Sequence, residues 1–390
     1  MFLRGSITKI SRWTASAVAA LALAACVQTS GNQGPRIDTS KTIVVGMLVP
    51  QGSGQPDQEA LADSLVAAAR LAVSEMEDVK IDLRVYPTAG NADQATAAAQ
   101  RAASEGAKII VGPLFAGAAN AAGTAVARKN INVLSFSNNP EIAGGNVFIL
   151  GDTFANTADR LIGYSAAQGK RTVVGLVRAD AAGDVAVSAM QSAAARNGVQ
   201  YAGAARYALS TESAVAAVSS TKSLIAQTGA SALIMDADSA GALPVFAQLL
   251  PENGVTSSAT QFIGLARWDR TSEQVRAIAG VQGSLFAMPD TAATAAFNQR
   301  FTATYGNGPH ILAGKAYDAM RAVGALLREG SSDALTRAKL TRASGFTGAN
   351  GVFRLRPDGT NQRALAVATF QDGQVVVLDP APRGFGGAGL

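Results

Sequence analysis

The feature that most constrains this chain is a regular alternation of short apolar runs and amphipathic segments through residues 41–379. The run Ile43–Val49 is almost wholly apolar, which is typical of a strand buried on both faces of a sheet. Apolar residues then recur at three- and four-residue spacing, which predicts a helix that packs on that sheet: Leu61, Leu65, Ala68, Ala72 and Met76. Strands and helices that alternate in this way form parallel sheets with helices on both faces.

The alternation occurs in two series, which indicates two lobes. The first series contains predicted strands at 43–49, 81–85, 107–111 and 131–136, with predicted helices at 61–76, 93–104 and 116–129. The second begins near Arg171, with predicted strands at 172–177, 199–207 and 232–235 and helices around 185–196 and 213–227. We therefore expect an α/β fold of two doubly wound parallel-sheet lobes.

The first 25 residues follow the order of a secretory signal peptide. Three basic residues and no acidic residue come first, then an apolar stretch at 13–23, then small residues before Cys26, the one cysteine of the chain. The run Leu23-Ala24-Ala25-Cys26 resembles a lipoprotein lipobox, in which the cysteine is lipidated. An ordinary signal peptide or a short membrane anchor is the alternative, but the apolar stretch is shorter than the roughly 20 residues that span a bilayer. We expect an exported protein that is tethered to a membrane through Cys26.

Charge and composition narrow the class further. The net charge is +5, and loss of three basic residues with the signal peptide leaves +2. No cluster of basic residues interleaved with aromatic ones remains, which argues against nucleic-acid binding. With Cys26 lipidated, no thiol is left for a disulfide. Residues 26–41 are polar and predict a flexible tether, and the Pro- and Gly-containing end at 380–390 predicts a disordered tail.

No residue pattern predicts catalysis. The single histidine, His310, follows Pro309 at the start of a predicted helix, which favours a turn or capping role. One histidine without a free thiol cannot form a His/Cys metal site. No G-x-S-x-G turn stands between a strand and a helix, and Gly52 and Gly54 lack the further residues of a dinucleotide-binding loop. We expect no enzyme, no metal and no cofactor.

Three segments resemble one family, the leucine/isoleucine/valine-binding proteins. Phe346-Thr347-Gly348-Ala349-Asn350-Gly351-Val352-Phe353 with Pro357-Asp358-Gly359 resembles the family's return segment, with a shorter first spacing. Ala316-Tyr317-Asp318-Ala319-Met320 resembles its late helix, and Ile109-Ile110-Val111-Gly112-Pro113 its third strand and turn. The resemblance covers about residues 42–379 in order.

The resemblance implies the type 1 periplasmic binding-protein fold. That fold has two lobes joined by three crossovers, and a cleft between them that closes by hinge motion. We place the crossovers near Gly151, Ala287 and Phe346. The first lobe would then contain residues 42–151 and 287–346, and the second 152–286 and 347–379.

Ligands of such sheets bind beyond the carboxyl ends of the strands. The turns at those ends contain the candidate ligand-binding residues: Ser53, Ala116, Gly117, Ser135, Ser137, Asn138, Ala182 and Trp268. The family places serine-rich residues after the third strand, whereas residues 114–118 have no hydroxyl, although amides at a helix N-terminus can bind an anion. The family's acidic position aligns near Phe154 and its Tyr-Gly pair with Ala182-Gly183, although Asp152 and Asp180 lie close to these positions. Leucine, isoleucine and valine are therefore expected to bind weakly.

Where the sequence departs from the leucine/isoleucine/valine-binding proteins, it resembles a second group with the same fold, the penicillin-binding-protein activators. The G-x-x-x-W-D element at 264–269, the turn Ser137-Asn138-Asn139-Pro140 and Arg363 resemble those lipoproteins, which regulate peptidoglycan synthases. The interpretation favoured is an activator whose partner is a peptidoglycan synthase. The alternative is a receptor that delivers branched-chain amino acids or similar small solutes to the permease subunits of an ABC importer. The neutral Val27 after Cys26 is similar to outer-membrane sorting signals, so the expected location is the periplasm, lipid-anchored to the outer membrane.

Overall fold

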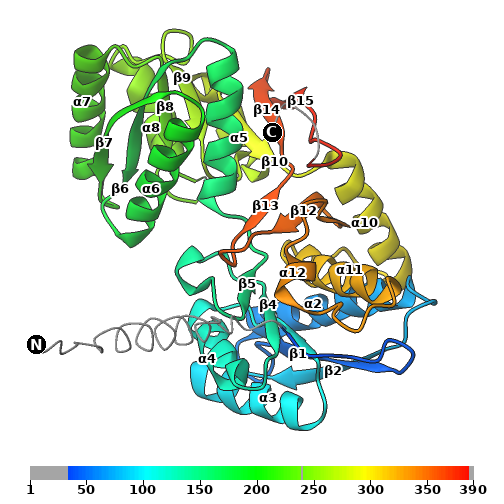
Figure 1. Ribbon diagram of the computed structural model, residues 1–390. Helices are drawn as coiled ribbons and strands as arrows, with labels where there is room; N and C mark the ends of the chain where they lie inside the picture. The colour runs from blue at the N-terminus through cyan, green and yellow to red at the C-terminus, as the bar shows by residue number, and fades with distance from the viewer. Residues whose placement is uncertain (1–33, 239, 386–390) are drawn as a thin grey trace, which may run out of the picture.

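The computed structural model describes residues 34–238 and 240–385, which form two α/β lobes (Figure 1). The first lobe contains a five-stranded sheet in the order β2-β1-β3-β4-β5, and every neighbouring pair is parallel. Its strands are β1 (Ile43–Val49), β2 (Ile81–Pro87), β3 (Ile109–Val111), β4 (Asn132–Ser135) and β5 (Val147–Ile149). The central strands β1, β3 and β4 are almost fully buried, as the apolar runs predict.

Helices cover both faces of this sheet, and each face has its own core. Helices α3 (Ala92–Ser104) and α4 (Ala116–Ala127) pack on one face. Helices α2 (Pro56–Ser74) and α11 (Ala313–Arg328) pack on the other, with α10 (Thr291–Tyr305) and the short α12 (Arg337–Leu340) beside them. Three of these six helices, α10, α11 and α12, come from the last third of the chain, so a segment distant in sequence completes the first lobe.

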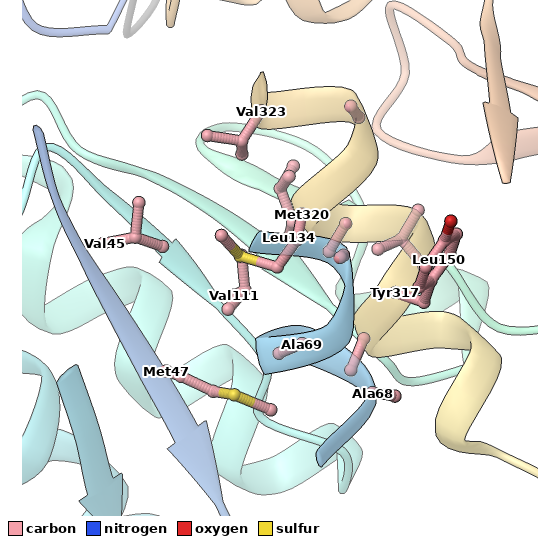
Figure 2. Packing of buried hydrophobic residues seen from close by; sticks show 14 of the residues in the cluster. Val45, Met47, Ala68, Ala69, Val111, Leu134, Leu150, Tyr317, Met320 and Val323 are labelled. Carbon is pink, nitrogen blue, oxygen red and sulfur yellow. The ribbon is translucent and has the colours of Figure 1, made fainter. Parts of the chain in front are cut away.

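Small residues allow α2 and α11 to approach closely. Ala68 and Ala69 of α2 lie next to Met320 of α11 in the core (Figure 2). A Cβ added to Gly324 of α11 would stand 2.0 Å from the sulfur of Met76, so glycine leaves room for the buried methionine side chain in this position. Close helix packing of this kind gives each apolar side chain many neighbours and fixes α11 relative to the sheet.

The second lobe contains a seven-stranded sheet in the order β15-β14-β10-β9-β8-β6-β7. Its strands are β6 (Thr172–Arg178), β7 (Gln200–Tyr207), β8 (Ala232–Met235), β9 (Gln261–Gly264), β10 (Leu285–Met288), β14 (Ala366–Gln371) and β15 (Gln374–Asp379). The neighbouring helices are α5 (Phe154–Ala167), α6 (Ala181–Arg196), α7 (Thr211–Thr228), α8 (Leu243–Glu252) and the short α9 (Glu273–Arg276). The expected fold of two doubly wound lobes is confirmed.

One edge of the second sheet differs from a purely parallel arrangement. Strand β14 pairs antiparallel with β10, and β15 pairs antiparallel with β14. The turn between β14 and β15 is made by Asp372 and Gly373, both with positive φ, which suits the two-residue turn of a β-hairpin. The hairpin is local, so it adds an antiparallel edge without another helix.

The chain passes between the lobes three times. The first passage is at residues 150–153, and the second follows β10 (Leu285–Met288). The third does not occur at Phe346. Phe346 and Phe353 are buried in the first-lobe core against α11, so the chain stays there and returns only after Arg363. Residues 346–363 form a small antiparallel sheet before this third crossover: β11 (Phe346–Gly348), β12 (Gly351–Leu355) and β13 (Asn361–Arg363).

The first and third crossovers are fastened side by side. The Asn361 side-chain amide donates to the carbonyls of Ile149 and Gly151 at 3.0 and 2.9 Å, and its oxygen accepts from Asn156 at 2.8 Å. Arg363 Nη2 donates to the Leu150 carbonyl at 2.5 Å. These buried bonds hold two hinge segments together.

Both ends of the body extend further than the sequence predicts. Ile37 is buried in the first-lobe core, and Gly34 exchanges two hydrogen bonds with the Asn130 side chain, so residues 34–41 pack on the lobe instead of forming a tether. In the expected tail, Ala381 is buried and the Arg354 guanidinium lies 4.7 Å from the ring of Phe385. The expected signal peptide, Cys26 and residues 386–390 lie outside the described residues.

Candidate functional site

A cavity of about 500 Å³ lies between the lobes. Volumes of roughly 300–1,000 Å³ are typical of small-molecule sites. Its first-lobe wall comes from the turns after β3 and β4 and from the start of α11, and the rest comes from the first crossover, the start of α5 and the turn after β9. The lining residues are Leu114, Phe115, Ala116, Phe136, Ser137, Asn138, Asn139, Gly151, Asp152, Thr153, Phe154, Thr157, Leu265, Ala266, Arg267, Leu312 and Lys315. Both lobes and a hinge segment therefore contact the same space.

The turn after β4 brings polar groups to the cavity. The buried Ser135 hydroxyl donates to the Pro113 carbonyl at 2.8 Å and accepts from the Ser137 N–H at 3.1 Å. A Cβ added to Gly151 would stand 2.6 Å from Asn138 Cα, so glycine lets the crossover lie against this turn. Ser135 thus shapes the turn, and Ser137 and Asn138 line the cavity.

Most of the remaining lining is apolar. Phe115, Phe136 and Phe154 contribute aromatic rings, and leucines come from both lobes: Leu114, Leu265 and Leu312. Apolar walls with a few placed polar groups are the usual composition of a ligand site. The cavity therefore suits a ligand with an apolar body.

An ion-pair cluster forms one end of the cavity. Lys315, whose side chain is only 3% exposed, donates from Nζ to Asp152 Oδ1 at 2.5 Å. Arg363 Nε lies 3.3 Å from the same oxygen, although its direction does not make a hydrogen bond. Arg363 Nη1 donates to the fully buried Asp318 at 2.8 Å. The cluster joins α11 to the first and third crossovers.

The cluster shifts the acidity of its members. Partial burial disfavours the ionised form of Asp152, whose side chain is 40% exposed, but the charges of Lys315 and Arg363 outweigh it and hold the pKa of Asp152 well below its usual range. Burial, together with the neighbouring Arg363, lowers the pKa of Lys315 to about 8, against the attraction of Asp152 and Asp318. Strongly perturbed groups in a cleft are typical of functional sites.

The wall from the second lobe carries a further cation and, behind it, a buried aromatic. Arg267 lines the cavity and is held by Asp269 through two hydrogen bonds of 2.7 and 2.6 Å. Trp268 was expected in the cleft but is fully buried in the second-lobe core, where its Nε1 donates to the Ala237 carbonyl at 2.8 Å. Its ring lies over Gly264, where an added Cβ would stand 2.4 Å from ring atoms. The G-x-x-x-W spacing is thus a packing arrangement.

Three of the eight candidate residues line the cavity: Ala116, Ser137 and Asn138. Ser135 lies directly behind them. Ser53 belongs to a loop held by Glu59, to which its hydroxyl donates at 3.2 Å. Gly117 and Ala182 stand in the first turns of α4 and α6 and do not line the cavity. Of the two nearby acidic residues, Asp152 is in the cavity, whereas Asp180 caps α6 by accepting from the Gly183 N–H at 3.0 Å.

Sequence reasoning missed Lys315 and the lining role of Arg267. A usable signal for Lys315 existed, because a lysine between Gly314 and Ala316 interrupts an apolar helix face three residues before Asp318. Of the two roles expected for His310, the structure shows the turn: its Nδ1 accepts from the Leu312 N–H at 3.2 Å, just before α11, and α11 itself has no side-chain cap. In residues 34–238 and 240–385 there is no cluster of three or more metal-binding side chains, and no helix there is long and apolar enough to cross a membrane.

Two lobes, three crossovers and a cavity lined by both lobes define a bilobal ligand-binding protein. The sequence profile of the periplasmic binding protein family matches residues 42–374, so the chain belongs to that family, as its sequence motifs predicted. No curated protein matches the sequence significantly.

Solved structures show the same fold. A putative branched-chain amino acid ABC transporter protein from Rhodospirillum rubrum is 17% identical with a TM-score of 0.71, over 87% of this chain and 100% of the other. A leucine-binding protein from Thermotoga maritima is 16% identical with a TM-score of 0.57, over 87% and 99%. A solute-binding protein from R. palustris in complex with benzoate is 18% identical with a TM-score of 0.57, over 90% and 99%. At these identities the likeness concerns the fold.

Proposed function

We propose that this protein is a non-enzymatic solute-binding protein of the periplasm that presents a small molecule to the permease of an ABC importer. The observation that carries the proposal is the cavity between the lobes, which contains lining residues from both lobes and from the first crossover. A ligand in such a cavity contacts both lobes at once and favours the closed state by its differential affinity. The solved structures of transport binding proteins support the same assignment.

The regulatory role, that of a penicillin-binding-protein activator, is the second candidate. The observation that favours it is the turn at 114–118, which has no hydroxyl to bind an amino-acid carboxylate. The other motifs support it less, because Trp268 fills the second-lobe core and Arg363 binds Asp318 and the hinge. Both residues have structural roles that do not depend on a partner protein.

Affinity capture from detergent-solubilised membranes distinguishes the two roles. The full chain, tagged at its C-terminus, is expected to recover ABC permease subunits in a ligand-dependent manner. The permease signal should rise when the cavity ligand is added, because closure changes the surface that both lobes present together. Recovery of a peptidoglycan synthase without any permease would contradict the import role and support the regulatory one.

We also propose that Cys26 is lipidated and anchors the body to the outer membrane. Cys26→Ser is expected to move the protein from the membrane fraction to the soluble fraction, or to leave it unprocessed, because lipidation requires the thiol. Two or three acyl chains give stable attachment where one chain is marginal, so the wild type should resist extraction by salt. A Cys26→Ser variant that still fractionates with membranes after normal processing would contradict lipidation.

A further inference from the structure

Lys315 occupies a position at which a positive charge is unfavourable for the stability of the fold. It stands in the first turn of α11, where the helix dipole disfavours positive charge, and its side chain is 3% exposed. Burying an ammonium group is costly unless its protons are all satisfied. Its ammonium group makes one hydrogen bond within the described residues, to Asp152, so two of its three protons have no partner there, and Lys315 lines the cavity. A local rule broken in this way is expected at a functional position.

The charges around the cavity favour an anion. Its lining contains two cations, Lys315 and Arg267, and a single carboxylate, Asp152. Arg267 is compensated by its own partner, Asp269. The Asp152 carboxylate already faces Lys315 at 2.5 Å and Arg363 at 3.3 Å through one oxygen. A ligand ammonium that approached Asp152 would therefore meet the like charges of two cations.

We propose that Lys315 binds the carboxylate of the ligand, and that the cavity selects small monocarboxylates with an apolar body over α-amino acids. This inference rests on the solute-binding function proposed above and specifies the chemistry of the solute. The apolar body would contact Phe115, Phe136 and Phe154, and the amides and hydroxyls of the turn after β4 lie on the same cavity.

The test compares probes with the same apolar body. Calorimetry on the full chain would use 4-methylpentanoate, its amide and leucine, and in parallel 3-phenylpropanoate, its amide and phenylalanine. The carboxylate of at least one series is expected to bind about 10- to 100-fold more tightly than its amide or amino acid, the factor for one charge-assisted hydrogen bond. Equal or tighter binding of the amino acid would overturn the inference and leave the solute-binding function intact. If no probe of either series binds, the monocarboxylate inference is overturned, and the solute-binding function is still decided by the permease capture.

Lys315→Met removes the charge and keeps a similar volume. It is expected to weaken carboxylate binding about 10- to 100-fold while leaving the weaker binding of the amide unchanged. The matched control is Lys222→Met, because Lys222 is exposed on α7 and does not line the cavity. Unchanged carboxylate affinity in Lys315→Met would overturn the role of this side chain.

The pH profile tests the same role in the wild type. The charged groups that act on Lys315 are Asp152 on the crossover, Arg363 on β13 and Asp318 on its own helix, and Arg267 lines the same cavity. Since the pKa of Lys315 is lowered to about 8, carboxylate affinity should be constant below that pH and fall as pH rises through it. Lys315→Met should lack this fall. A flat wild-type profile between pH 6 and 9.5 would contradict the proposal even if the variant does not fold.

Discussion

Asp318→Ala is expected to lower the free energy of unfolding by about 3–5 kcal/mol, the cost of removing one partner of a buried ion pair. Asp318 is fully buried and accepts from Arg363 Nη1 at 2.8 Å and from the Ala349 N–H at 2.7 Å. The substitution leaves both donors without this acceptor, in a place that water does not reach. Urea denaturation followed by circular dichroism measures the loss as a shift in the midpoint.

Two controls make this result specific. Asp318→Asn retains an oxygen acceptor of the same shape and should cost less than Asp318→Ala. Asp78→Ala removes the partner of Arg328 in a pair whose side chains are 45% and 55% exposed, and should shift the unfolding midpoint only slightly, because exposed ion pairs contribute little to stability. If Asp318→Ala cost no more than Asp78→Ala, the buried pair would not be a main support of the hinge.

The architecture of the lobes was predictable because its determinants are local. An apolar run such as Ile43–Val49 is typical of a strand that is buried on both faces of a parallel sheet. The apolar faces of the helices can be located from the 3.6-residue period. The third crossover was not predictable in this way. Phe346 and Phe353 are apolar strand residues that fit either lobe, and only the contact with α11 places them in the first.

The site was predictable in part for the same reason. Turns at the carboxyl ends of strands can be located from the sequence, and Ser137 and Asn138 were found there. Lys315 and Asp152 are 163 positions apart, so no local pattern connects them. Their pairing depends on the fold, which brings α11 against the first crossover.

Two glycines of the motifs that carried the family resemblance lie where the hinge segments meet the first lobe. A Cβ added to Gly348 would stand 2.0 Å from Asp318 Oδ1, so glycine leaves room for the carboxylate. Gly359 has a positive φ, and its carbonyl accepts from the Ile149 N–H at 2.9 Å. Such residues identify the fold because they are needed to join the lobes, and they say little about the ligand.

The second large effect is expected at Trp268. Trp268→Ala should lower the free energy of unfolding by about 3–5 kcal/mol, because it leaves a large cavity in the second-lobe core. The side chain is fully buried, and the Ala237 carbonyl would lose its indole donor. The matched control is Asn138→Ala, which changes a cavity-lining side chain and should leave the unfolding midpoint almost unchanged. Equal stability of the two variants would contradict the core position of Trp268.

A double-mutant cycle tests the packing of this ring directly. Gly264→Ala alone should cost about 1–3 kcal/mol, because the new methyl group meets the Trp268 ring and overpacks the core. An added Cβ would stand 2.4 Å from two ring atoms, closer than any tolerated contact. Once Trp268 is alanine the clash is gone, so Gly264→Ala should cost little in that background and the two effects should not add. Strict additivity of the two unfolding free energies would show that the ring does not lie on Gly264, and the G-x-x-x-W spacing would then need another explanation.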